Sequence, residues 1–125
     1  MKKLLVLLFS LLISFNSHGL FEKTVCVLTD AEKRKDECWL CWYLPNETEP
    51  FTGNNLCFFE NGQKRFEGKI IDGKKNGKNT VWHKNGNLRA KATFKDGENH
   101  GKWTLWWRNG QKWWEGNYKN GKRVG

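Results

Sequence analysis

The sequence predicts an all-β protein, an elongated antiparallel β-sheet of tandem hairpins that repeats every 24 residues. Three sets of turn residues support this prediction, because each recurs at the same period. An Asn-Gly pair recurs at Asn61-Gly62, Asn85-Gly86 and Asn109-Gly110. A second pair recurs at Asp72-Gly73, Asp96-Gly97 and Asn120-Gly121, and single glycines recur at Gly53, Gly77, Gly101 and Gly125. A fixed period of this length indicates a repeat array.

The residues between the turns alternate in polarity, as expected for strands with one covered face. From Leu88 to Lys95, Leu, Ala, Ala and Phe fall on one face, while Arg, Lys, Thr and Lys fall on the other. Alternation over this length is typical of a half-buried antiparallel strand. Asn-Gly and Asp-Gly pairs supply the positive φ values that tight type I′ hairpin turns need. We therefore expect each unit to be one hairpin.

Aromatic residues recur at matching repeat positions and predict an aromatic ladder along the sheet. The ladder comprises Phe58, Trp82 and Trp106 on one strand of each unit, and Phe66, Trp114, Phe94 and Tyr118 on the other. Stacked aromatic pairs add roughly 0.5–1.5 kcal/mol each beyond area burial, and we expect the ladder to be part of the core. The small residues Gly68, Ala92 and Gly116 between large apolar ones predict that a neighbouring side chain lies over the backbone there.

The chain divides into three predicted segments. Residues 1–19 are a predicted signal peptide, residues 20–52 an N-terminal cap rich in cysteine and aromatic residues, and residues 53–125 three repeats, at 53–76, 77–100 and 101–124. We expect the cap to cover the exposed end of the first repeat, as terminal units of repeat arrays do.

The signal peptide is predicted from its order of charge, apolarity and small residues. Lys2 and Lys3 precede an apolar run that ends at Phe15, and small residues place the cleavage after Gly19. The run is shorter than the roughly 20 residues of a membrane-spanning helix, although an uncleaved anchor is the alternative. We therefore expect export to the periplasm or cell envelope of a bacterium.

Charge is distributed unevenly along the chain. The whole sequence has 22 Lys and Arg against 13 Asp and Glu, but the residues from Gly53 onward hold 16 basic and 6 acidic side chains. A basic array attracts acidic proteins, anionic lipid or nucleic acid, and export argues against nucleic acid. The alternative reading is that Lys and Arg side chains point outward for solubility and to deter edge pairing.

The four cysteines, Cys26, Cys38, Cys41 and Cys57, all follow the predicted signal peptide. In an exported small domain they favour two disulfides. Because Cys57 lies in the first repeat, we expect its partner in the cap, which would join the cap to the array. A zinc site is disfavoured because only one CxxC is present. A redox pair at Cys38 and Cys41 is disfavoured because no βαβ pattern surrounds it. Free thiols are the remaining alternative.

The sequence offers no catalytic, cofactor-binding or metal-binding constellation. His18 lies in the predicted signal peptide, His100 at a predicted turn, and His83 on a strand at the position of Phe59 and Trp107. No Ser/His/Asp spacing or phosphate-binding glycine loop is present, and the glycines recur with the turns. We therefore expect a protein without enzymatic activity.

With these residues in view, the chain resembles the MORN-repeat variant. The resemblance rests on one spacing pattern. An Asn-Gly pair is followed after five residues by a small residue, after three more by an Asp-Gly or Asn-Gly pair, and after a further three by a glycine. The lead-in, Trp42 to Leu44 and then Glu49 to Gly53, is similar to that of the bacterial YwqK-family antitoxins. The resemblance covers about residues 38–125. It implies tandem hairpins without catalytic residues and a toxin as the protein partner, and MORN arrays more broadly imply membrane lipid and protein contacts.

Three hypotheses for function follow. The first is a protein-binding module of antitoxin or immunity type, with Trp103, Trp107, Trp113 and His83 as the candidate contact residues. The second is binding to an anionic membrane surface, or an envelope scaffold, through the basic array. The third, a carbohydrate binder, has no sequence feature in its favour. The sequence predicts no oligomeric state.

Overall fold

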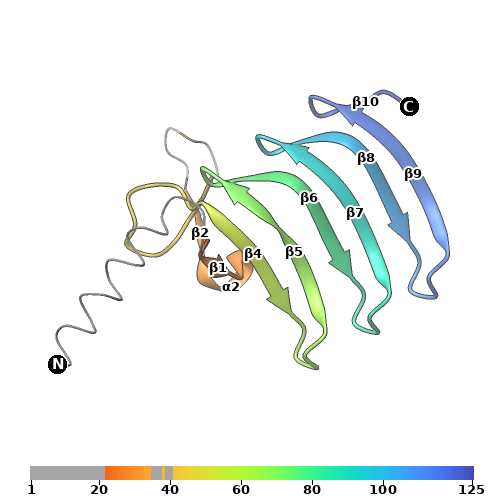
Figure 1. Cartoon of the computed structure of the whole chain (residues 1–125), viewed down its shortest axis with the longest axis horizontal. Coiled ribbons are helices and arrows are strands. Elements are labelled where there is room, and N and C mark those ends of the chain that lie inside the picture. Colours follow the sequence, from red (N-terminus) through yellow and green to blue (C-terminus); the bar gives the residue numbers. More distant parts are fainter. Residues whose placement is uncertain (1–21, 35–37, 39–40) are drawn as a thin grey trace.

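The computed structural model describes residues 22–34, 38 and 41–125; the predicted signal peptide lies outside them. The all-β prediction is confirmed: eight strands form one sheet in the order β1-β4-β5-β6-β7-β8-β9-β10, and β2 and β3 pair separately. The sheet strands are β1 (Thr24–Val25), β4 (Gly53–Phe58), β5 (Lys64–Ile71), β6 (Lys74–Trp82), β7 (Leu88–Lys95), β8 (Glu98–Trp106), β9 (Lys112–Lys119) and β10 (Lys122–Arg123). From β4 to β10 consecutive strands pair antiparallel, and Figure 1 shows them stacked as successive hairpins.

The two kinds of Gly turn have different conformations. At Asp96-Gly97 both residues have positive φ, 49° and 85°, and the equivalent pairs at the β5–β6 and β9–β10 connections agree. These are the type I′ turns that the sequence predicted. At the Asn-Gly pairs only the glycine has positive φ, 84° at Gly62, and its N–H donates to the Phe59 carbonyl at 3.0 Å. The two-residue type I′ expectation is therefore wrong there: each Asn-Gly lies in a longer loop.

Each longer loop is accompanied by a β-bulge near the end of the strand that leads into it. The register shifts between Cys57 and Phe58, and again at Val81/Trp82 and Leu105/Trp106. The Asn side chains of these loops also connect neighbouring hairpins. The Asn61 Nδ2 donates to the Lys84 carbonyl at 3.0 Å. One repeat later, a side-chain amide donates to the Arg108 carbonyl in the same way. The recurrent Asn therefore fixes the spacing between repeats.

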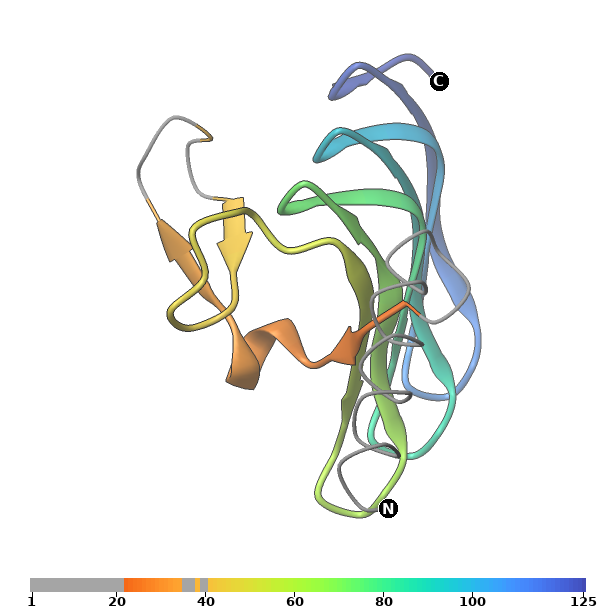
Figure 2. The same ribbon diagram turned by 60° about the vertical axis from the view of Figure 1, so that its left-hand side comes forward.

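Strand alternation gives the sheet two different faces. The inner face, which turns toward the cap, carries Asn55, Phe66, Ile70, Lys75, Asn79, Val81, Ala90, Ala92, Phe94, Trp103, Leu105, Trp114 and Tyr118. The outer face carries mainly Lys, Thr and Glu, with Trp82 and Trp106. Figure 2 shows the sheet bending so that its Asp-Gly turns lean toward the side of the cap.

The structure divides the predicted aromatic ladder between these faces. Phe66, Phe94, Trp114 and Tyr118 lie on the inner face, whereas Phe58, Trp82 and Trp106 lie on the outer face. Phe58 is 54% exposed, so it is no part of the core. The physical reason is that strand residues alternate between faces. Phe58, Trp82 and Trp106 each follow directly after an inner-face residue, Cys57, Val81 and Leu105, so they point to the opposite face.

The small residues behave as the sequence predicted. A Cβ built at Gly68 would lie 2.4 Å from the Asn79 Oδ1, and one at Gly116 would lie 2.7 Å from the Trp114 ring. A neighbouring side chain therefore does cover the backbone at both positions. A larger residue would displace it.

The cap is built from β1, the short helix α2 (Val27–Asp30) and the pair β2 (Glu32–Arg34) and β3 (Cys41–Tyr43). β1 adds a parallel strand to the edge of β4. After β1 the chain leaves the sheet, and α2, β2 and β3 stand on the side of the inner face (Figure 2). The predicted strand at 24–28 ends after two residues, because α2 begins where the Cys26 N–H donates to the Asp30 Oδ2 at 3.2 Å. The cap therefore extends the sheet at the edge of β4 and also packs against the inner face.

The core lies between the cap and the first hairpin. Val27, Phe51 and Ile70 form a buried cluster, with Val25, Ala31, Trp42 and Leu44 packed against it. The Val27 N–H donates to the buried Asn55 Oδ1 at 3.0 Å. A disulfide joins Cys26 to Cys57, which confirms the predicted link between cap and array, and a second joins Cys38 to Cys41. The hydrophobic core is thus concentrated at the N-terminal end of the sheet.

Candidate binding surfaces

Beyond the cap, the inner face continues as an uncovered cluster of large side chains. We call Trp103, Leu105, Trp114 and Tyr118 the open cluster; each is partly exposed. The Trp103 ring lies 5.5 Å from that of Trp114, edge to face, and 5.4 Å from that of Tyr118. Such arrangements are favourable for aromatic pairs. The rings therefore form one packed platform on β8 and β9.

Repeat positions show why this platform is open. Ile70, Phe94 and Tyr118 occupy the same position in successive hairpins. Ile70 is 0% exposed because the cap packs on it, whereas Phe94 and Tyr118 are partly exposed. The cap therefore determines which copy of this position belongs to the core.

The predicted contact residues Trp107 and Trp113 form a separate feature, where the β8–β9 loop begins and ends. Their rings stack at 5.1 Å with an interplanar angle of 27°. They are 54% and 48% exposed. The equivalent pair in the first hairpin is Phe59 with Arg65, whose guanidinium lies 5.4 Å from the ring centroid. The position is thus a general packing site that the third repeat fills with two tryptophans.

Neither histidine in the described part of the chain stands as a free surface group. A ring nitrogen of His83, the Nε2, lies 3.1 Å from the Trp106 carbonyl oxygen, which ties the second repeat to the third. His100 lies in β8, and its Nδ1 accepts a hydrogen bond from the Asn120 N–H at 3.4 Å. Both side chains therefore have structural roles between repeats. His83 was a predicted contact residue, and the structure brings its ring to the backbone carbonyl of Trp106.

A cleft of about 240 Å³ separates the cap from the inner face. From the cap it is lined by Val27, Leu28, Lys33 and Trp42; from the sheet it is lined by Asn55, Phe66, Lys75, Asn79, Val81, Ala90, Ala92, Phe94 and Trp103. Most of this lining is apolar, which is typical of small-molecule sites. Two ammonium groups and two amides supply the polar part.

Electrostatics in the cleft centre on Lys75. Desolvation of its ammonium lowers the pKa of Lys75 below the ordinary value, and the charge of Lys33 lowers it further. Each of the two ammoniums lies over an aromatic ring, Lys33 at 4.9 Å from Trp42 and Lys75 at 5.0 Å from Phe94. These cation–π contacts hold both charges at the cleft.

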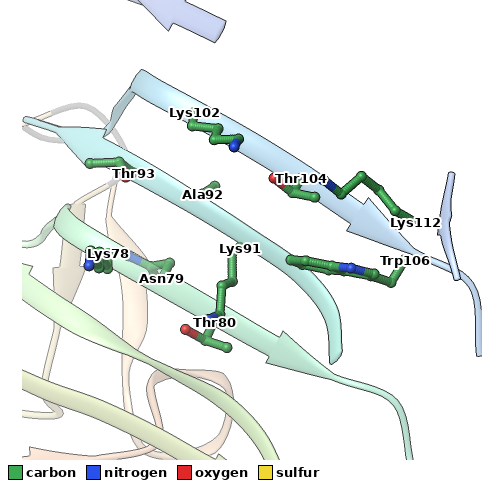
Figure 3. A pocket seen from close by; sticks show the side chains of 10 residues that line it. All are labelled: Lys78, Asn79, Thr80, Lys91, Ala92, Thr93, Lys102, Thr104, Trp106 and Lys112. Atoms are coloured by element: carbon green, nitrogen blue, oxygen red, sulfur yellow. The ribbon is translucent and has the colours of Figure 1, made fainter. Parts of the chain in front are cut away.

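The outer face carries a basic hollow of about 370 Å³ across β6, β7 and β8. Figure 3 shows the side chains of Lys102, from β8, and Lys112, from β9, extending toward Thr104. Both ammoniums pair with Glu115, at 2.9 Å and 2.6 Å, and these hydrogen bonds lower the pKa of the Glu115 carboxyl. The other lining residues are Lys78, Asn79, Thr80, Lys91, Ala92, Thr93 and Trp106.

A related hollow lies one repeat earlier, across β4, β5 and β6. There Glu67 takes the place that Lys91 has in the later hollow, and it pairs with Lys64 at 2.6 Å. Within the described residues, Lys78 and Lys91 make no ion pair. The later hollow is therefore the more positive of the two.

Sequence reasoning missed the residues of the cleft. The sequence pattern singled out none of Lys33, Lys75 and Asn79, which the structure brings to the cleft. One signal was available for Asn79. It shares its repeat position with Asn55 and Trp103, so an amide recurs where an apolar side chain is expected on the inner face. Lys33 and Lys75 meet only through the crossing of the cap, which no local pattern encodes.

Two further kinds of feature are absent from the described residues. No group of three or more His, Cys, Asp or Glu side chains there could hold a metal ion. Over residues 22–34, 38 and 41–125, no helix has the length and apolarity needed to cross a membrane.

Comparison with known proteins identifies the repeat type. The family described as MORN repeat variant matches residues 75–96 and 99–120. The first match spans β6 and β7 and the second spans β8 and β9, so the matched units begin 24 residues apart, which is the predicted period. No curated protein and no solved structure shows a significant match. The sheet from β6 to β9 is therefore similar to MORN-variant repeats.

Proposed function

We propose that this protein is a non-enzymatic protein-binding module whose partner docks on the open cluster of the inner face. One observation carries the proposal: the inner face is apolar along the array, but the cap covers only its N-terminal end. Tryptophan and tyrosine are the residues that most often dominate binding energy at interfaces. MORN repeats are generally protein-binding or membrane-binding modules, which supports the same conclusion.

The charge of the array specifies the partner further. With 16 basic and 6 acidic residues from Gly53 onward, the surroundings of the open cluster favour an acidic partner. Arg123 lies 5.3 Å from the Trp114 ring centroid and adds a positive charge at this platform. The expected partner surface has an apolar anchor residue ringed by carboxylates.

The proposal also includes the cellular compartment in which the protein acts. The Cys26–Cys57 and Cys38–Cys41 bridges fit an oxidising, extracytoplasmic environment. This agrees with the export expected from residues 1–19. The resemblance to the YwqK-family antitoxins nominates an exported toxin as the partner, so that the protein would act as an antitoxin or immunity protein in the envelope.

The experiment is a binding measurement with an acidic exported protein encoded beside this gene. Calorimetry with the mature chain should give a 1:1 complex, and Trp114→Ala with Tyr118→Ala should weaken it at least thirtyfold, the size of an interface hot spot. Trp82→Ala, on the outer face, is the matched control and should leave the dissociation constant unchanged. Equal weakening by both changes, or by the control alone, would contradict docking on the inner face.

The outer face favours a second candidate function, binding to an anionic membrane surface. The supporting observation is the basic hollow, in which Lys78 and Lys91 have no carboxylate partner in the described structure. Each basic side chain near an anionic bilayer contributes about 1 kcal/mol. The mature protein should then co-sediment with phosphatidylglycerol vesicles at low salt and be released at high salt. Lack of binding at low salt would eliminate this candidate.

A further inference from the structure

The cleft under the cap contains a buried donor that nothing in the described structure uses. Asn79 is 8% exposed, and its Nδ2 has no hydrogen-bond partner within residues 22–34, 38 and 41–125. An unpaired buried amide donor costs free energy, so such a group in a lined cleft points to an occupant. The equivalent Asn55 shows how the position works, since its Oδ1 accepts the Val27 N–H of the cap. Asn79 lies one repeat beyond the reach of that cap segment.

The two ammonium groups of the cleft repel each other and have no counter-ion among the described residues. Among the described residues neither Lys33 nor Lys75 makes an ion pair. Asp96 and Glu98, with Lys74, line a neighbouring hollow that shares both lysines. No carboxylate in the described part of the chain lies within ion-pair distance of either ammonium. Both side chains remain exposed to solvent, but two like charges held near one site favour an anion between them.

The remainder of the cleft is apolar and small. Phe66, Val81, Ala90 and Phe94 supply its lining on the sheet side, and Leu28, which is 49% exposed, stands on the cap side. The volume of about 240 Å³ is below that of typical drug-sized sites, which begin at roughly 300 Å³. An occupant must therefore combine one anionic group with a short apolar body.

We propose that this cleft binds a small monocarboxylate with an unbranched apolar body, of the medium-chain fatty acid class. The carboxylate accepts hydrogen bonds from the Lys33 and Lys75 ammoniums and from the Asn79 Nδ2. The alkyl chain lies between the cap and Phe66, Val81 and Ala90. The site adjoins the open cluster, because Trp103 belongs to both. It would bind a different class of ligand, so the inference goes beyond the proposed protein-binding function and does not depend on it.

The test is calorimetric titration of the mature, disulfide-bonded protein with hexanoate, octanoate and decanoate. Each added CH₂ should tighten binding up to roughly fourfold until the cleft is full. Octylamine, which has the same body and the opposite charge, should not bind, and acetate should bind far more weakly than octanoate. Equal binding of octylamine and octanoate, or of acetate and octanoate, would overturn the proposal.

Two variants and one control locate the ligand. Lys75→Gln should weaken octanoate binding about tenfold or more, since hydrogen bonds to charged groups are the strong ones. Lys78→Gln, on the outer face of the same strand, should leave the affinity unchanged. Ala90→Phe should abolish binding by filling the cleft. The neighbouring repeats carry Phe66 and Trp114 at this position, so the hairpin accommodates a large ring there.

The outcomes separate cleanly. Loss of binding in Ala90→Phe, with retained circular dichroism and thermal midpoint, supports the site under the cap. Binding that survives both Ala90→Phe and Lys75→Gln, or that falls equally in Lys78→Gln, overturns it. Absence of any octanoate binding by the wild-type protein overturns it as well and leaves the partner-docking proposal untouched.

Discussion

The first and third hairpins are copies of one unit in different surroundings. Ile70 and Tyr118 hold the same repeat position, yet Ile70 is fully buried under the cap, while Tyr118 is partly exposed beside Trp103 and Trp114. Both hairpins still have the same strand register and the same β-bulge. The comparison teaches that turns and backbone pairing build the hairpin, whereas the cap decides whether its apolar face becomes core or surface.

The largest expected effect comes from truncating Ile70, the copy of this repeat position that the cap covers. Ile70→Ala should lower the free energy of unfolding by about 4 kcal/mol, toward the upper part of the range for large-to-small core changes, because the disulfide-linked cap restricts collapse of the cavity. Tyr118→Ala should cost markedly less. Urea denaturation at fixed m-value measures both. Equal losses at the two positions would show that the cap does not create the difference.

The next effect tests the covalent link between cap and array. Replacing both Cys26 and Cys57 by Ser opens a link between residues 31 apart in sequence and should cost roughly 2–4 kcal/mol. Amide hydrogen exchange should then rise first in β1, α2 and β4, while β8 and β9 keep their protection. The double replacement avoids a free thiol. If hydrogen exchange rises uniformly across all hairpins, the stability of β8 and β9 depends on the cap, which contradicts the prediction.

The smallest effect compares two equivalent glycines. Gly73 and Gly97 both have positive φ, 79° and 85°, so alanine at either should cost about 1–2 kcal/mol of left-handed strain. A Cβ at Gly73 would also meet the Cys41 Cβ at 2.5 Å, whereas one at Gly97 finds its first neighbour at 3.6 Å. Gly73→Ala should therefore lower the thermal midpoint more than Gly97→Ala. Gly97→Ala serves as the matched control for strain, and identical shifts would contradict tight cap packing.

Much of the fold was predictable because its signals are local. The period, the type I′ turns at Asp96-Gly97 and its equivalents, and the covered backbone at Gly68 all follow from residues close in sequence. The Asn-Gly loops were misjudged because the same dipeptide serves a two-residue turn or a longer loop that has only its glycine at positive φ. Only the bulge register distinguishes them.

The candidate sites were less predictable, because they depend on which face a residue occupies. Trp106 and Trp114 read as members of one ladder, but they lie on opposite faces of the sheet. Trp103 was a predicted contact residue, and the structure does place it in the open cluster. The proximity of Lys33 to Lys75 could not be predicted from the sequence, because it depends on how the cap packs against the inner face.

The sequence by itself determined the hairpin unit and its repetition, because turn conformation and strand alternation depend on neighbouring residues and recur wherever those residues recur. Only the tertiary structure decided what each copy of the unit does. The cap contacts one end of the array, and contacts between residues distant in the chain are set by how the chain crosses itself. Burial therefore differs between Ile70 and Tyr118 although their repeat positions are the same.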